Sequence, residues 1–376
     1  MSFETLQGSQ DNERINLAVR TISTYSPSGQ ESRLANLIQD ELSEKGFHPR
    51  IDAAGNVVCE YGIGDTSILL CGHMDTIPGE LPIRSENGEL YGRGACDAKG
   101  ALLSLLFAFE DLASPQTRAK IIFAAVTDEE QKSAGLTELI KNNIRSDYAV
   151  FGEPGGFSSI TIGYRGHLTI KLEVNTPEVH ASAPKLTTNA AELLFELYNS
   201  IKRGLDAVNS ESTYRISASL TEISGGSAHN VIPGRINATI DVRIPVGFSN
   251  EQAMSKIEAV AATCRLSNPD AKISLLLADP TEPYKVRLDS PLVRAISRSI
   301  LRSGKKPSMV TKSGTGDMNT YALTYGIDAV TYGPGDAKLS HTSREHVNFK
   351  EILDCSAVLV SAVRELIAMK NKVKSE

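Results

Sequence analysis

Imidazole and carboxylate side chains follow four apolar runs of this chain, at the point where each run ends. They are His73 with Asp75, Glu129 with Glu130, Glu153, and His341. A further carboxylate, Asp97, lies in the glycine-rich segment GRGACDAKG. Because the sites of open α/β sheets lie outside the carboxyl ends of the strands, we expect these side chains to meet at one edge of a sheet.

Two imidazoles and three carboxylates suit two divalent cations that share one carboxylate. Zinc accepts imidazole nitrogen and carboxylate oxygen, and a catalytic zinc site leaves one position open for water. Cobalt and manganese accept the same ligands. Without a cation, the clustered carboxylates would repel one another and bind protons. A single histidine at a strand end is more often an ordinary surface or core residue, but the joint pattern favours a two-metal site.

The apolar runs that deliver these side chains predict the fold. The runs 67–71, 120–126, 148–151 and 328–332 are typical of buried strands, and helical patterns such as 99–112 lie between the first three. Strands that alternate with helices predict an α/β domain with a doubly wound, mainly parallel sheet.

The middle of the chain predicts a second domain. Strand and helix patterns follow one another there in the order βαββαβ, which is the ferredoxin-like arrangement. Its strands are expected at 167–174, 214–223, 235–244 and 272–279, and its helices at 189–205 and 250–265. We expect residues 166–278 to form this inserted lid domain, and residues 1–165 and 279–376 to form a discontinuous catalytic domain.

Composition narrows the function further. The net charge of −6 argues against nucleic acid as a partner. The five cysteines are scattered without a CxxC pair, so neither a disulfide framework nor a thiolate zinc site is expected. No segment is apolar over the length needed to cross a bilayer, and the N-terminus lacks the apolar core of a signal peptide. These features predict a cytoplasmic protein without a membrane partner.

The motifs HMD, GRGACDAKG, TDEE, GEP and a late YGPG…SHT…E occur in this order along the chain. Together with GGSAHNVIPGRINATIDVR in the predicted lid, they resemble the family of aminoacylase, acetylornithine deacetylase and succinyl-diaminopimelate desuccinylase. These proteins are co-catalytic zinc amidohydrolases, and the resemblance extends over essentially the whole chain.

The resemblance implies roles for the ligands of two zinc ions. His73 and Glu153 would hold one ion, and Glu130 and His341 would hold the other. Asp97 would bridge the two ions.

The resemblance also implies roles for the neighbours of these ligands. Asp75 would accept a hydrogen bond from the far nitrogen of His73 and so fix its orientation. Glu129 would be the general base that takes a proton from water and passes it to the leaving amine. The peptide bond Asp97–Ala98 would be cis.

Three lid residues are implied to contact the substrate. His180 would stabilise the oxyanion, often from the partner subunit of a homodimer, although a strand-end histidine without function is the alternative. Asn230 and Arg243 would bind the carboxylate end of the substrate, since arginine binds carboxylates through two parallel hydrogen bonds. For Arg243, a surface ion pair is the alternative.

The compact segment between His73 and Asp97 favours one substrate class. It looks most like the hydrolases that release lysine or ornithine from the C-terminal glutamate of an amino-group carrier protein. Such carriers are small and acidic, so a basic rim around the site is expected. Its candidate residues are Arg84, Arg93, Lys185, Lys312, Lys338 and Arg344.

Two other functions remain open from the sequence. The first is a deacetylase of free N-acetyl-ornithine, N-acetyl-lysine or N-acetyl-citrulline. The second belongs to another class, a metal-containing binding protein without catalysis. The presence of Glu129, which would ligate nothing in this scheme, favours an enzyme.

Overall fold

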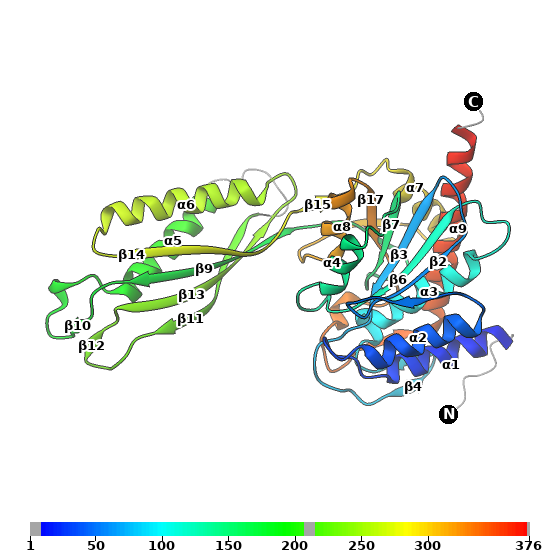
Figure 1. Cartoon of the computed structure of the whole chain (residues 1–376), viewed down its shortest axis with the longest axis horizontal. Helices are drawn as coiled ribbons and strands as arrows, with labels where there is room; N and C mark the ends of the chain where they lie inside the picture. Colours follow the sequence, from blue (N-terminus) through cyan, green and yellow to red (C-terminus); the bar gives the residue numbers. More distant parts are fainter. Residues whose placement is uncertain (1–8, 207–214, 374–376) are drawn as a thin grey trace. The chain divides into compact units, whose positions relative to one another are not determined.

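The computed structural model describes residues 9–206 and 215–373, and it divides into two compact units (Figure 1). The first unit comprises residues up to Ile162, Val286–Val310 and those from Gly316 onward. The second comprises Gly163–Lys285 and Thr311–Thr315. The sequence-based boundaries, 166 and 278, are too narrow because the last long strand of the second unit continues to Thr281. They also miss 311–315, which joins the second unit where Thr315 donates to the carbonyl of Arg165 at 3.2 Å.

The first unit is built on a mixed sheet whose four central strands are parallel. In spatial order they are β6 (Lys120–Val126), β3 (Ser67–His73), β7 (Tyr148–Gly152) and β17 (Asp328–Thr331). Antiparallel strands flank them: β2 (Val57–Tyr61) and β1 (Arg50–Ile51) beyond β6, and β8 (Ser159–Tyr164) beyond β17. The strands β15 (Tyr284–Lys285) and β16 (Ser308–Lys312) pair with β8. The prediction of a mainly parallel sheet is therefore confirmed at the centre.

Helices cover both faces of this sheet, as the pleat of β7 demonstrates. Phe151 packs against Tyr321 of α8 (Asp317–Tyr325), with ring centroids 5.7 Å apart. A methyl group on the next residue, Gly152, would lie 2.7 Å from Leu105 of α3 (Gly100–Leu112). Because successive strand residues face opposite sides, α8 and α3 lie on opposite faces, as a doubly wound fold requires.

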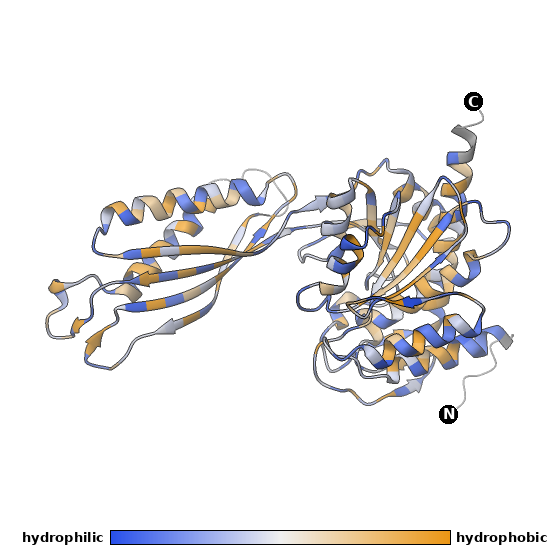
Figure 2. Cartoon of the chain, viewed as in Figure 1, coloured by the Kyte–Doolittle hydropathy of each residue, from blue (hydrophilic) through white to orange (hydrophobic). Residues whose placement is uncertain are grey.

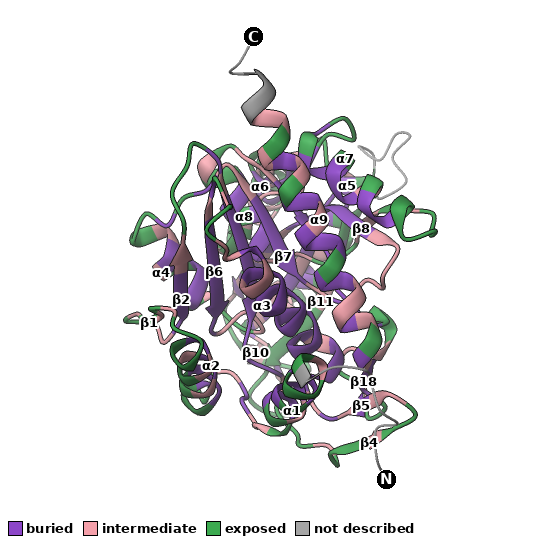
Figure 3. Cartoon of the chain, turned by 90° about the vertical axis from the view of Figure 1, so that its right-hand side faces the viewer, coloured by how far each residue is buried: buried purple, intermediate pink, exposed green. Residues whose placement is uncertain are grey.

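The remaining helices of the first unit complete these two layers. They are α1 (Ser9–Ser23), α2 (Ser32–Glu44), α4 (Ala134–Lys141), α7 (Pro291–Arg302) and α9 (Phe349–Val373), with a π-helical turn at Ala95–Lys99 and a 3-10 turn at Ala337–Leu339. Helix α3 is apolar on nearly every side because the sheet and α9 enclose it. The apolar colour of the central strands in Figure 2 and their burial in Figure 3 mark the same core.

A small three-stranded sheet joins two distant segments of the first unit. Strands β4 (Arg84–Glu86) and β5 (Glu89–Tyr91) form a hairpin, and β18 (His346–Asn348) pairs with β5. The hairpin turns through Asn87 and Gly88, both at positive φ. Asn-Gly is the dipeptide favoured in two-residue hairpin turns whose central residues both have positive φ. This sheet was not predicted.

The second unit has the predicted βαββαβ order. Its elements are β9 (Gly166–Asn175), α5 (Ala190–Asp206), β11 (Ser217–Gly225), β13 (Arg235–Ile244), α6 (Asn250–Ser267) and β14 (Lys272–Thr281). The strands are antiparallel in the ferredoxin-like order β11-β13-β9-β14, and α5 and α6 pack on the apolar residues of one sheet face. The short strands β10 (Val179–His180) and β12 (Val231–Ile232) pair outside this sheet, next to a 3-10 turn at Pro184–Leu186.

Two further expectations can be compared with the fold. All five cysteines are free, and four of them are buried: Cys59, Cys71, Cys96 and Cys355. Among the helices of the described residues, none has the length and apolar character that a membrane crossing requires.

Candidate metal centre

Strand β3 ends with His73, whose ring is oriented by the residue two positions later. The Nδ1 atom of His73 lies 2.9 Å from the carbonyl oxygen of Asp75 and 3.4 Å from its Oδ1. The carbonyl, rather than the expected carboxylate, is therefore the closer acceptor. With Nδ1 engaged, Nε2 is the nitrogen that is free to bind a cation.

The carboxylate of Asp75 is fully buried and organises the turn that follows β6. It accepts hydrogen bonds from the backbone N–H groups of Glu129 at 3.1 Å and Glu130 at 3.0 Å, and from the Ser28 hydroxyl at 2.8 Å. Asp75 thus holds the two glutamates in place relative to the end of β3.

Asp97 lies between the two histidines of the predicted site. Its Oδ1 is 3.5 Å from Nε2 of His73, and its Oδ2 is 3.5 Å from Nε2 of His341. Each oxygen therefore faces a different imidazole, which is the arrangement that a carboxylate shared by two cations needs. The peptide bond Asp97–Ala98 is cis, as the resemblance implied.

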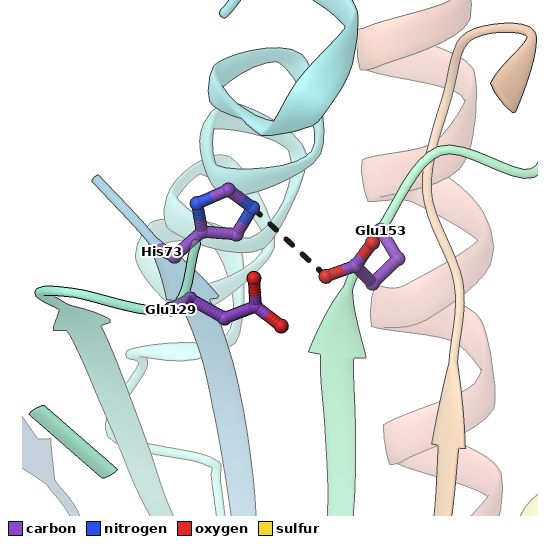
Figure 4. Close-up of side chains that lie close together, drawn as sticks. All are labelled: His73, Glu129 and Glu153. Carbon is purple, nitrogen blue, oxygen red and sulfur yellow. Dashed lines mark ion pairs between the residues drawn. The ribbon is translucent and has the colours of Figure 1, made fainter. Parts of the chain in front are cut away.

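The three glutamates divide between the two histidines. Glu153, directly after β7, lies 3.9 Å from Nε2 of His73, and Glu130 lies 2.8 Å from Nε2 of His341. Glu129 comes from the turn after β6, and its carboxylate points between His73 and Glu153 (Figure 4). Potential ligand atoms of His73, Glu129 and Glu153 lie within 4.8 Å of one another, as do those of His73, Asp97 and Glu130.

Two residues of the site have a left-handed backbone. His341 has φ +64°, and Asp128, which opens the turn bearing Glu129 and Glu130, has φ +62°. Such conformations are uncommon outside glycine and concentrate at functional sites. They turn the chain sharply enough to return these side chains to the sheet edge.

The centre carries an excess of negative charge. Burial, followed by the charge of Glu153, raises the pKa of Glu129 well above its ordinary value. Burial lowers the pKa of His73, but the carboxylates of Asp75 and Asp97 outweigh it and raise this pKa well above the usual range. Both raised pKa values favour the protonated forms of Glu129 and His73 in the protein without metal. Bound divalent cations would supply the missing positive charge instead. The donor set fits such cations, with imidazole nitrogen and carboxylate oxygen facing common centres.

Sequence reasoning gave no role to Glu345, which holds the backbone of Asp97. Its buried carboxylate accepts hydrogen bonds from the N–H groups of Asp97 at 2.9 Å and Cys96 at 3.2 Å. The same carboxylate pairs with Arg93 at 2.9 Å, and the Arg93 side chain is only 10% exposed. The prediction that Arg93 belongs to a basic rim is therefore wrong, because its guanidinium is buried against Glu345.

Glu351 at the start of α9 acts in the same way on two other loops. It accepts hydrogen bonds from the N–H of Phe157, beyond Glu153, at 2.8 Å and from the N–H of Gly335, before His341, at 3.1 Å. One carboxylate thereby connects the loops that carry two of the candidate ligands. A lone glutamate in a helical pattern gives no sequence signal for this contact.

Asp317 was also missed. It is buried at the first position of α8, after Gly316, and a methyl group on Gly316 would lie 3.6 Å from Oε1 of Glu129. Burial raises the pKa of Asp317 to about 6. The signal was available, since GTGD, like GRGACD, is a glycine-rich turn that opens a helix.

The three predicted lid residues belong to the second unit. His180 and Asn230 are neighbours, because the N–H of Ala181 donates to the carbonyl of Asn230 at 2.8 Å. Both are exposed, and Nδ1 of His180 lies 2.8 Å from the Ser182 hydroxyl.

Arg243 of β13 already has a carboxylate partner within the second unit. Its Nε and Nη2 each donate to one oxygen of Asp241 at 2.9 Å, and its Nη1 donates to the Thr315 hydroxyl at 3.3 Å. This ion pair holds the guanidinium plane in one orientation.

Comparison with known sequences agrees with this geometry. The sequence model of peptidase family M20/M25/M40 matches residues 69–365. A curated relative, the LysW-lysine/LysW-ornithine hydrolase of Sulfurisphaera tokodaii, is 32% identical over 356 residues, which cover 94% of this chain and 96% of the relative.

Solved structures share the fold at low sequence identity. Aminopeptidase PepT from Bacillus cereus superimposes with a TM-score of 0.81 at 19% identity, covering 95% of this chain and 99% of that chain. The YXEP protein of Bacillus subtilis, titled a dinuclear metal binding peptidase, has a TM-score of 0.71 at 16% identity, covering 96% and 98%.

The contacts of Glu345 generate a testable prediction. Glu345→Gln removes the charge that orients Asp97 and pairs with Arg93, so we expect the affinity for divalent cations to fall by about 10- to 100-fold, the usual effect of losing a group that supports a ligand. Competition with a fluorescent chelator measures this. Glu365→Gln, which removes a glutamate of α9 paired with Arg298 at 2.7 Å, is the matched control and should leave the affinity unchanged. Unchanged affinity in Glu345→Gln, with only a lower melting temperature, would show a purely structural role.

Proposed function

Because this chain belongs to peptidase family M20/M25/M40, a family of metal-dependent hydrolases, we propose that it hydrolyses a linear amide to release lysine or ornithine from a glutamate-linked amino-group carrier protein. The observation that carries the hydrolytic part is Asp97, whose two oxygens face the imidazoles of His73 and His341, with the Glu129 carboxylate pointing between His73 and Glu153. The substrate is inferred from the relatives named for LysW-linked lysine and ornithine. We place the reaction in the cytoplasm, where amino acids are synthesised.

The centre would hold two divalent cations. His73 and Glu153 would bind one, Glu130 and His341 would bind the other, and Asp97 would be shared. Zinc, cobalt and manganese all suit these donors. When bound, such ions polarise an amide carbonyl and make water at the centre more acidic.

The protein's own side chains would then move the proton. Glu129 takes it from the attacking water and returns it to the nitrogen of the leaving amino acid. Asp75 keeps Glu129 in position, because its carboxylate accepts the Glu129 backbone N–H at 3.1 Å.

We expect Glu129→Gln to lower kcat by about two to four powers of ten, which is the usual contribution of a positioned general base. Because glutamine keeps the shape of the side chain, and Glu129 is not assigned as a ligand, the metal content should match that of the wild type. Elemental analysis of protein purified without chelator, at up to two ions per chain, provides this control. Near-normal turnover in the variant would remove Glu129 from this role.

The carrier-linked substrate is distinguished from free acetylated amino acids by its salt response. Association with a charged protein is steered electrostatically, and a Debye length of about 10 Å at 0.1 M salt screens it. We expect kcat/KM on carrier-linked lysine or ornithine to exceed that on N-acetyl-lysine, N-acetyl-ornithine and N-acetyl-citrulline at low salt, and this advantage to shrink as salt rises. Efficient, salt-independent hydrolysis of an acetylated amino acid, with no activity on the carrier conjugate, would favour the deacetylase alternative.

We also propose a homodimer formed through the second unit. The edge strands β11 and β14 leave backbone groups that another chain could pair with. In such a dimer, the exposed His180 of one subunit would stabilise the oxyanion in the site of the other.

Subunit mixing tests this arrangement. We expect His180→Ala and Glu129→Gln to be nearly inactive separately and to regain activity when mixed, since a hybrid dimer contains one site with both an intact Glu129 and an intact partner His180. Analytical ultracentrifugation of each variant verifies the dimer. A fully active monomer, or no recovery after proven exchange of subunits, would contradict the proposal.

A further inference from the structure

A groove of about 460 Å³ lies on the first unit beside the small sheet of β4, β5 and β18. Its apolar wall consists of Leu81, Pro82 and the ring of Tyr91. Its other wall is the segment from Ser343 to His346, which follows the candidate ligand His341 along the chain.

Cationic and aromatic groups are stacked along this groove. The guanidinium of Arg84 lies 3.9 Å from the centre of the Tyr91 ring, and the His346 ring packs against Tyr91 with centroids 4.8 Å apart and planes inclined by 31°. Nδ1 of His346 lies 2.7 Å from the carbonyl of Arg344, which fixes the ring. The planar groups of Arg84, Tyr91 and His346 are thus held in one stack.

The positive charge of the groove is only weakly balanced. The nearest carboxylate to Arg84 is that of Glu86 at 3.8 Å, and both side chains are more than half exposed, so this pair is loose and contributes little. Arg344 is exposed and forms no ion pair with a carboxylate among the described residues. The carboxylate of Glu345 is turned inward to Arg93 and Asp97. Two arginines therefore present charge to the groove in a chain whose net charge is −6.

The groove lies next to the metal centre on the same unit. Ser343 follows His341 by two residues, and two residues of extended chain span at most about 7 Å. Glu345 lines the groove, and its side-chain carboxylate accepts a hydrogen bond from the N–H of Asp97. A chain that leaves the centre on this side would enter the groove after about two residues.

We propose that this groove binds an acidic polypeptide segment of the carrier, on the acyl side of the scissile amide. This inference rests on the proposed function. Arg84 and Arg344 would pair with carboxylates of the segment, and Leu81 and Pro82 would pack against its apolar atoms. The rest of the chain is acidic on balance and would repel an acidic partner. The positive groove would therefore determine where the carrier docks.

The test compares two substrates that differ only in the carrier. One is the carrier protein with lysine on its C-terminal glutamate, and the other is the dipeptide γ-glutamyl-lysine. In the full-length enzyme, Arg84→Glu with Arg344→Glu should lower kcat/KM on the carrier substrate about tenfold or more, mainly through KM. The loss on γ-glutamyl-lysine should be several-fold smaller.

Arg118→Glu is the matched control. Arg118 is an exposed arginine just before β6, whereas the centre follows the other end of this strand, about 20 Å away. It makes the same change of charge as either groove substitution by itself, far from the groove, and should alter neither substrate's kinetics.

The outcomes separate the two proposals. Equal losses on both substrates, or no loss on the carrier substrate, would refute the groove while leaving the proposed function intact. Failure of the wild-type enzyme to release lysine from either substrate would refute the proposed function itself. Calorimetric binding of the charged carrier to Glu129→Gln, with and without the groove substitutions, measures docking apart from turnover. Equal affinity in both would also refute the groove.

Discussion

Mutual repulsion of the carboxylates at one sheet edge is the constraint on which this structure depends. Asp75, Asp97, Glu129, Glu130 and Glu153 gather around His73 and His341 because parallel strands end at the same edge. Such a cluster is stable only where positive charge or N–H donors face it. The fold supplies the N–H donors, and bound cations would supply the positive charge. Metal binding would therefore stabilise the folded form of this sheet edge.

Backbone N–H groups carry much of this compensation. Asp75 takes those of Glu129 and Glu130, and Glu345 takes those of Cys96 and Asp97. In each case a buried carboxylate that is not itself a candidate ligand fixes the chain next to one that is. The centre is thus positioned by hydrogen bonds from its backbone N–H groups to these buried side-chain carboxylates.

Local signals in the sequence predicted the strands and the candidate ligands that follow them. Each apolar run forms a strand whose ends lie within two residues of the predicted ones. The contacts that escaped prediction are long-range. Glu345 and Asp97 are 248 residues apart, and in sequence a glutamate beside arginine and histidine is indistinguishable from an ordinary surface charge. Arg93 was assigned to the surface for the same reason, since only the folded chain brings Glu345 against it.

The discontinuity of the first unit sets an order in time for the assembly of its centre. Strands β6, β3 and β7, with their four candidate ligands, are complete before the second unit is translated, whereas β17 and His341 follow it. N-terminal segments fold first during synthesis, so the nascent chain can build most of the sheet edge early. The second imidazole, that of His341, is added only after the second unit has been synthesised. A ribosome-bound or prematurely terminated chain that stops before His341 would therefore remain without the full centre.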